Sequence, residues 1–148
     1  MPARSETLSY LIDTCVISEL VRPQPHAAVV EWISSVEEGE LFLSALTLGE
    51  LHKGVAKLVD PQRARRLMLW LDRDVVARFA GRILPVDVAV ARSWGRLVGE
   101  AAARGLTLPI IDALLAATAQ QHALSVVTRN VRDLERCGVE VVNPWDLG

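Results

Sequence analysis

The spacing of apolar residues changes several times along the chain, and these changes predict strands alternating with helices. Short apolar runs bounded by polar residues predict strands at residues 8–12, 41–44, 124–130 and 139–145, with a brief extended piece at 82–87. Apolar residues three and four positions apart predict helices at 15–22, 26–36, 47–58, 60–79, 88–105 and 109–123. Strands separated by helices favour a parallel sheet with right-handed crossovers and helices on both faces.

Capping residues agree with several of these boundaries. Asp60 is placed to cap the helix at 60–79, with Pro61 at its first position. Gly105 ends the helix at 88–105. Thr47 is a candidate cap for the helix at 47–58, and Glu50 then stands where a capping-box partner belongs.

Length and composition predict one folded unit. The 148 residues suit a single domain spanning 1–148, and 51% hydrophobic residues argue against disorder. The net charge of -2 argues against binding nucleic acid over the whole surface, although a local basic patch is compatible with it. Cys15 and Cys137 share no metal-ligand spacing, so we expect reduced thiols. No membrane span or signal peptide is expected, and the protein is expected to be soluble and cytoplasmic.

Polar residues follow three of the predicted strands or lie on the helices next to them. Asp13 ends the first strand, and Asn130 stands at the end of the segment 124–130. Asp112 lies in the first turn of the helix before that segment, and Glu50 lies on the helix after the second strand. Ligands of open parallel sheets collect at the carboxyl ends of the strands, so these side chains are expected to converge.

Converging carboxylates predict a metal site. Carboxylates that lie close together repel one another, and a divalent cation relieves that repulsion. Mg²⁺ prefers oxygen ligands, so Asp13, Glu50 and Asp112 are the predicted metal ligands, and Mn²⁺ is a predicted substitute. Asn130 and Asp133 are candidates for further oxygen contacts. Such a metal would activate a water molecule for in-line attack on a phosphodiester.

Each of these residues also has a purely structural interpretation. Asp13 would cap the helix that follows it, and Glu50 would only complete the capping box of Thr47. Asp112 would interact with a helix dipole. Asn130 and Asp133 would be turn or cap residues.

Basic residues lie close to the same strand ends. Lys53 shares a helical face with Glu50, and Arg129 and Arg132 follow the strand at 124–130. Taken singly, each is an ordinary solvated charge; together they predict a local basic rim around an acidic centre, which a nuclease that binds the phosphate backbone needs. Glu19 is a further candidate on the first helix, whereas Trp145 is expected to pack in the core or an interface rather than stack on bases.

Four sequence blocks together resemble a known family. They are "YLIDTCVISEL", "LSALTLGELHKGV", "PIIDALLAATAQQHAL" and "VVTRNVRDLE". In this order and spacing they resemble PIN-domain ribonucleases, and within that superfamily the VapC-type toxins of bacterial toxin–antitoxin pairs. The resemblance extends from about Tyr10 to Trp145.

The resemblance implies a fold, an activity and partners. The fold is an α/β PIN-like three-layer α/β/α sandwich with a short parallel sheet of four to five strands. The activity is that of an Mg²⁺-dependent endoribonuclease toxin, which hydrolyses RNA phosphodiesters with metal-activated water. The implied partners are a cognate antitoxin that neutralises the toxin, an RNA substrate such as tRNA or another structured RNA, and a second copy in a homodimer. Operator DNA would be bound only through the antitoxin.

The resemblance also assigns residues. Asp13, Glu50 and Asp112 match the first three acids of the family, and Asn130 stands at the fourth position, where Asp133 would add a carboxylate through water. Thr14 and Thr128 match hydroxyl positions that support these acids. Cys15 stands where the family usually has an asparagine that braces the acids. The alternative is therefore a catalytically weak PIN-like module that acts mainly by binding antitoxin.

Overall fold

The computed structural model describes residues 8–147. Residues 1–7, where no signal peptide is expected, and residue 148 lie outside this range. The described chain forms one five-stranded sheet in the order β3-β2-β1-β4-β5, and every pairing is parallel. The strands are β1 (Tyr10–Ile12), β2 (Leu41–Ser44), β3 (Ile83–Leu84), β4 (Ser125–Val127) and β5 (Val141–Val142). The predicted parallel sheet is confirmed, with most strands shorter than expected.

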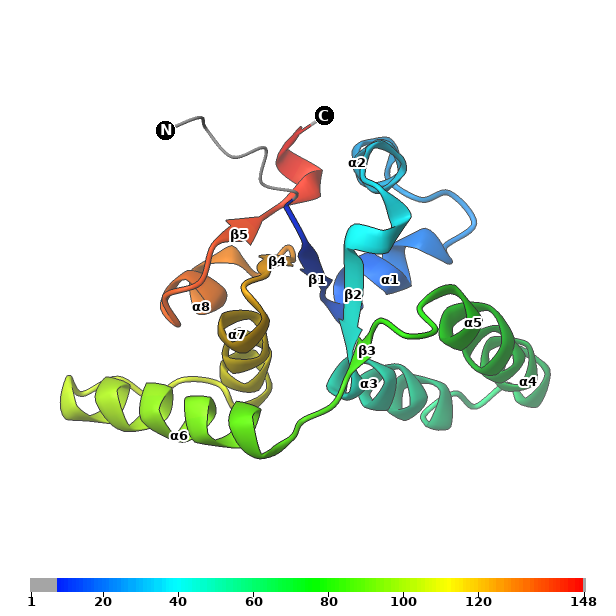
Figure 1. The fold of residues 1–148 in the computed structure, drawn as a ribbon. Coiled ribbons are helices and arrows are strands. Elements are labelled where there is room, and N and C mark those ends of the chain that lie inside the picture. Colours follow the sequence, from blue (N-terminus) through cyan, green and yellow to red (C-terminus); the bar gives the residue numbers. More distant parts are fainter. Residues whose placement is uncertain (1–7, 148) are drawn as a thin grey trace.

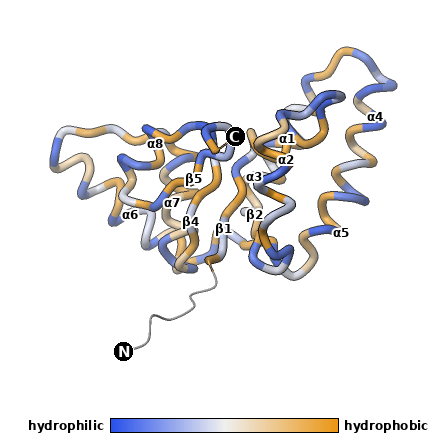
Figure 2. The backbone as a smooth tube through the Cα atoms, turned by 90° about the horizontal axis from the view of Figure 1, so that it is seen from above, coloured by the Kyte–Doolittle hydropathy of each residue, from blue (hydrophilic) through white to orange (hydrophobic). Residues whose placement is uncertain are grey.

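Helices cover both faces of this sheet, which gives the expected three-layer α/β/α sandwich (Figure 1). One face carries α1 (Thr14–Leu20), α2 (Ala27–Ser35), α3 (Ala45–Ala56), α4 (Pro61–Leu69) and α5 (Val76–Arg78). The other carries α6 (Val88–Ala103), α7 (Ile110–His122) and α8 (Val131–Glu135). Figure 2 shows the largely hydrophobic central strands between these two groups of helices.

The central strand β1 contributes to a hydrophobic core on each face. Successive side chains of a strand point to opposite faces, so Ile12 joins the core under α1–α5 and Leu11 joins the core under α6 and α7. Both side chains are completely buried. Because β1 is buried on both faces, a polar side chain is expected at the end of the strand rather than within it. Asp13 accordingly lies at the carboxyl end of β1.

Several helix boundaries differ from the sequence prediction. α3 begins at Ala45 because the Ser44 hydroxyl accepts the Leu46 N–H at 3.0 Å. Thr47 is therefore not the cap, and its buried hydroxyl has no partner among residues 8–147. The capping-box interpretation of Glu50, which depended on Thr47, was wrong.

Two further segments were not fully predicted. Asp60 caps α4 as expected, but the helix then passes through a π-helical turn at Trp70–Val75 before α5. α8 was missed, because the sequence prediction assigned no helix directly after the strand at 124–130. Within the described range, none of the helices is long and apolar enough to cross a membrane.

Candidate active site

Asp13 stands at the carboxyl end of β1, where its main chain and its side chain have separate partners. Its N–H donates to the Val127 carbonyl at 2.9 Å, which extends the pairing with β4. Its Oδ1 accepts the Thr14 N–H at 2.7 Å, so Asp13 does cap α1. The residue is only 9% exposed. The helix-cap interpretation is confirmed, but this hydrogen bond occupies only one of the two carboxylate oxygens.

Thr128, at the end of β4, holds the other oxygen. Its completely buried hydroxyl donates to Asp13 Oδ2 at 2.7 Å and accepts the Asn130 N–H at 3.0 Å. An ionised carboxylate accepts about four hydrogen bonds, so both oxygens of Asp13 retain capacity for another ligand. Thr128 therefore fixes the carboxylate without saturating it.

Cys15 lies against the same pair of residues at longer distances. Its Sγ is 3.9 Å from Asp13 Oδ2 and 3.6 Å from Thr128 Oγ1, and it accepts the Arg129 N–H at 3.5 Å. Burial and, to a lesser extent, the charge of Asp13 raise the pKa of the Cys15 thiol, which is therefore neutral. A thiol is a weak donor and a weak acceptor, so Thr128 makes the stronger contact to Asp13.

Glu50 approaches from α3 and is tied to the start of α1. The Thr14 hydroxyl donates to Glu50 Oε1 at 2.7 Å, which links the helices that follow β1 and β2. Glu50 also lines a cavity of about 410 Å³, together with Ala45, Leu46, Gly49, Lys53, Val86 and Ile111. The lysine of this cavity is the exposed Lys53, one turn further along the helix.

Asp112 completes the group from the first turn of α7. The Asn130 amide donates to Asp112 Oδ2 at 3.0 Å. Burial, with further contributions from the negative charges of Asp13, Asp133 and Glu50, raises the pKa of Asp112 to about 6. Hydrogen bonds through Thr128 and Asn130 connect Asp13 to Asp112, and Thr14, the residue after Asp13, contacts Glu50, so these acids lie at the same edge of the sheet.

This acidic group has no basic partner in the described part of the chain. Across residues 8–147, none of the four carboxylates forms an ion pair with lysine, arginine or histidine. Within the same range, no group of three or more Asp, Glu, His or Cys side chains is arranged to hold a metal ion by itself. Mg²⁺ usually takes one or two carboxylates and keeps several waters, so this donor set fits a water-rich ion better than a protein cage.

The remaining candidates occupy the surroundings of the acidic group. Arg132 is exposed on α8, and Arg129 is exposed with its guanidinium carbon 4.9 Å from the centre of the Trp145 ring. Trp145 packs partly against the core as expected, but the sequence did not predict its arginine neighbour. Glu19 does not join the acids, because its carboxylate accepts the His26 N–H at 2.9 Å and pairs with Arg22 at 3.2 Å.

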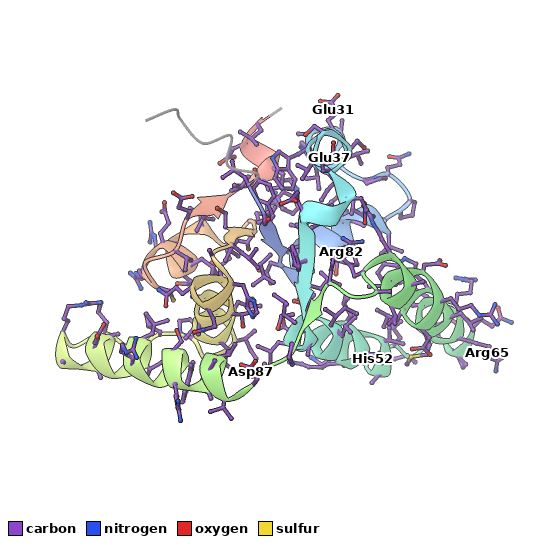
Figure 3. All side chains as sticks on the ribbon, viewed as in Figure 1. Glu31, Glu37, His52, Arg65, Arg82 and Asp87 are labelled. Atoms are coloured by element: carbon purple, nitrogen blue, oxygen red, sulfur yellow. The ribbon has the colours of Figure 1, made fainter. Side chains whose placement is uncertain are left out.

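The opposite edge of the sheet carries a compensated cluster. Glu38 precedes β2 and accepts hydrogen bonds from Arg78 at 2.9 and 3.0 Å and from Arg82 at 3.3 Å. The hydrogen bonds from Arg78, followed by the interactions with Arg82, lower the pKa of Glu38. Figure 3 shows Arg82 beside β2, far from Asp87 at the start of α6. Two arginines thus compensate the charge of Glu38, whereas the acids at the carboxyl edge have no basic partner among the described residues.

A comparison with protein families identifies the fold. The family model described as the PIN domain matches residues 10–139. The chain belongs to the PIN-domain family. The five-stranded parallel sheet and its two helical layers are this family's architecture, so the predicted fold class is confirmed. PIN-domain ribonucleases in general depend on divalent metal ions.

Curated relatives resemble this PIN domain over most of its length. Toxin FitB of Neisseria gonorrhoeae is 41% identical over 135 residues, covering 91% of this chain and 97% of FitB. VapC ribonuclease Y4jK of Sinorhizobium fredii is 36% identical over 136 residues, covering 92% of this chain and 97% of that protein. The family resemblance noted from the four sequence blocks is therefore confirmed.

Solved structures agree with this PIN domain in detail. The crystal structure of FitAcB from Neisseria gonorrhoeae superposes with a TM-score of 0.88 at 40% identity, covering 93% of this chain and 99% of that chain. The structure of FitAB bound to the IR36 DNA fragment gives a TM-score of 0.87 at 38% identity, covering 94% and 97% of the two chains.

Proposed function

We propose that this PIN domain is an endoribonuclease toxin of the VapC type, which hydrolyses RNA phosphodiesters and is neutralised by a cognate antitoxin. The main support is the group of carboxylates Asp13, Glu50 and Asp112, which have no basic partner among the described residues. Burial, followed by the charges of Asp13, Asp133 and Glu50, raises the pKa of Asp112 to about 6. The names of two relatives, a toxin and a VapC ribonuclease, support the same activity.

The metal is proposed to be Mg²⁺, with Mn²⁺ as a substitute. Asp13, Glu50 and Asp112 would hold it, and Asn130 and Asp133 would contribute through water. When bound, such an ion activates water and polarises the phosphate. The unused capacity of the Asp13 carboxylate oxygens, the excess of acids and the water-rich preference of Mg²⁺ all support this assignment.

The other residues are proposed to position these acids and the RNA. Thr128 would keep the Asp13 carboxylate turned toward the ligand, and Thr14 would do the same for Glu50. Cys15 would support Thr128 and Asp13 more weakly. The RNA phosphates on either side of the acidic group would be contacted by Lys53, Arg129 and Arg132.

The proposal extends to the organisation and partners of the chain. Residues 1–148 would form a single domain that acts on tRNA or another structured RNA in the cytoplasm. It would form a homodimer, bind its antitoxin, and contact operator DNA only through that antitoxin. The DNA-bound FitAB complex supports this last arrangement.

The decisive experiment is RNA cleavage by the antitoxin-free protein. We expect cleavage of structured RNAs with Mg²⁺ or Mn²⁺, none with EDTA, and none by Asp13→Asn. Glu38→Gln, which removes a carboxylate charge at the opposite edge, is the matched control and should cleave normally. Equal cleavage by Asp13→Asn would contradict the site assignment. Stable folding without cleavage of any RNA would favour the binding module instead.

A further inference from the structure

Arg129 and Trp145 form an exposed cation–π pair at the carboxyl edge of the sheet. The guanidinium carbon lies 4.9 Å from the centre of the indole ring, within the range of an attractive contact. Trp145 is partly buried against the core under α1–α5, while Arg129 is exposed. The indole is therefore a fixed support, and the arginine resting on it remains accessible to a ligand.

The contacts around Trp145 hold its main chain in place. Asn143 Oδ1 accepts the Trp145 N–H at 3.0 Å, and the Asn143 amide donates to Asp146 at 3.2 Å. Pro144 is buried and opens a short 3₁₀ helix that packs beside α2. A proline with a fixed φ and a closed turn leave the main chain at Trp145 little freedom, and the partly buried side chain packs against the core.

The pair lies directly beside the acidic group. The Thr128 N–H donates to the Val142 carbonyl at 2.9 Å, so the ends of β4 and β5 stay together. Arg129 follows the residue that holds Asp13 and precedes Asn130, which contacts Asp112. A nucleotide whose phosphate reaches the acids would therefore have a neighbouring base near Arg129.

Two other arginines, Arg78 and Arg82, also contact an aromatic ring but have acidic partners. Arg78 and Arg82 lie 5.5 and 5.3 Å from the centre of the Phe79 ring, but both also bind Glu38. Within residues 8–147, Arg129 has no carboxylate partner. Its planar, uncompensated cation suits a ligand that is both flat and anionic, and an unpaired nucleotide has these properties.

We infer that Arg129, held by Trp145, is a stacking surface for one unpaired nucleobase of the RNA, next to the phosphate that is cleaved. This inference rests on the proposed ribonuclease function. Proteins read unpaired RNA by stacking its bases on aromatic rings or on arginine planes. Arg129 then contacts the RNA through its plane as well as its charge, and Trp145 is the positioning residue behind it.

The test is a binding measurement in EDTA, where no cleavage occurs. Fluorescence anisotropy measures the affinity of the full chain for a labelled single-stranded RNA oligonucleotide containing all four bases. A series of oligonucleotides carries one abasic site, moved one position at a time. At one position the abasic site should weaken wild-type binding by about fivefold to tenfold, as expected for one stacked base.

Combining this series with protein variants isolates the stacking. Arg129→Ala should remove the effect of the abasic site at that position, and Arg129→Lys should remove it too, because lysine keeps the charge but not the plane. Trp145→Phe keeps an aromatic residue in the core, and it should reduce the loss of affinity that the abasic site causes. Arg132→Ala, a matched loss of charge on α8, should weaken binding to every oligonucleotide by the same factor.

Several results would overturn the inference. They are an abasic effect that survives in Arg129→Ala, an Arg129→Lys variant that retains the full effect, and a wild-type chain that binds no oligonucleotide. So would variants that lose antitoxin binding but bind RNA normally, because the pair would then serve the antitoxin. Metal-dependent cleavage is measured separately, so a failed stacking surface remains distinguishable from a failed ribonuclease.

Discussion

Glu38 at the amino edge of the sheet and Asp112 at its carboxyl edge have pKa shifts in opposite directions. At the amino edge, Glu38 binds two arginines, and the interactions with Arg78 and Arg82 lower its pKa. At the carboxyl edge, Asp13 and Asp112 have neutral hydrogen-bond donors, and the pKa of Asp112 rises to about 6. Glu38 is compensated by two arginines, whereas the acids of the carboxyl edge have no basic partner among the described residues and are proposed to bind a metal ion.

We expect the Glu38 contacts at the amino edge to contribute mainly to stability and the acids at the carboxyl edge mainly to function. Arg82 donates to the carbonyls of Glu38, Leu41 and Arg78, so it joins the start of β2 to the segment before β3. Such contacts stabilise the fold. The acids of the carboxyl edge repel one another in the absence of a cation, so they are expected to lower stability while making metal binding favourable.

The largest expected effect comes from removing a charge at the carboxyl edge. Asp112→Asn should reduce RNA cleavage by on the order of a hundredfold or more, because it removes a proposed metal ligand. Glu38→Gln should cleave at the wild-type rate per folded molecule. Initial rates with Mg²⁺ compare the two variants directly. Similar losses in both would show that the two edges do not differ in function.

The support behind Asp13 should matter less than the acids themselves. Thr128→Val removes the hydroxyl that donates to Asp13 and accepts from Asn130, so cleavage should fall by about tenfold. Thr118→Val is the matched control. Its buried hydroxyl donates to the Leu114 carbonyl within α7, away from the acids. Equal cleavage by both variants would remove Thr128 from the site.

At the amino edge, the expected loss is in stability. Arg82→Ala should lower the free energy of unfolding by about 2 kcal/mol, because several acceptors lose a charged donor. Arg78→Ala should cost about 1 kcal/mol at most, since its side chain is 39% exposed against 17% for Arg82. Urea unfolding measures both values. If either variant cleaved less RNA per folded molecule, the amino edge would also contribute to activity, which contradicts the proposed difference in function between the two edges.

The smallest expected effect concerns Cys15. Cys15→Asn replaces a neutral thiol by an amide that donates stronger hydrogen bonds to the carboxylate, so cleavage should rise by about twofold to threefold. Cys15→Ala should leave the Thr128 contact intact and lower cleavage by a similar factor. A tenfold or larger rise in Cys15→Asn would instead support the catalytically weak alternative for the natural sequence.

The fold could be predicted from the sequence because the local patterns of apolar residues and the helix caps agree with it. Short apolar runs such as residues 41–44 predicted β2 without error, and Asp60 with Pro61 predicted the start of α4. α8 escaped prediction because five residues are too few to show a helical period. The cap of α3 was misassigned because Ser44 and Thr47 both have side chains that commonly cap helices. Which of them caps α3 depends on where β2 ends, and in the structure it is Ser44.

The proposed site acids Asp13, Glu50 and Asp112 could be selected from the sequence, because a strand end and the neighbouring helices suggest that they lie at one edge. Their hydrogen bonds could not be predicted. The contact from Thr128 to Asp13 spans 115 positions and depends on the pairing register of β1 and β4. The stacking of Arg129 on Trp145 likewise depends on β5 lying beside β4. No sequence spacing encodes such pairings.

The central claim, that the carboxyl edge is a divalent-metal site, is tested most directly by thermal unfolding against pH. Because the pKa of Asp112 rises from 3.8 to about 6 on folding, the metal-free folded state holds this proton more tightly than the unfolded chain does. The stability from the protonated form is complete below about pH 4 and is lost as the pH rises through about 6.

Wild type and Asp112→Asn are therefore compared in EDTA and in Mg²⁺ across this range. In EDTA the wild type should lose Tm relative to the variant between about pH 4 and pH 7. Mg²⁺ should restore that loss above pH 6 in the wild type and have little effect on the variant. Overlapping pH profiles, or equal stabilisation of both proteins by Mg²⁺, would contradict the account.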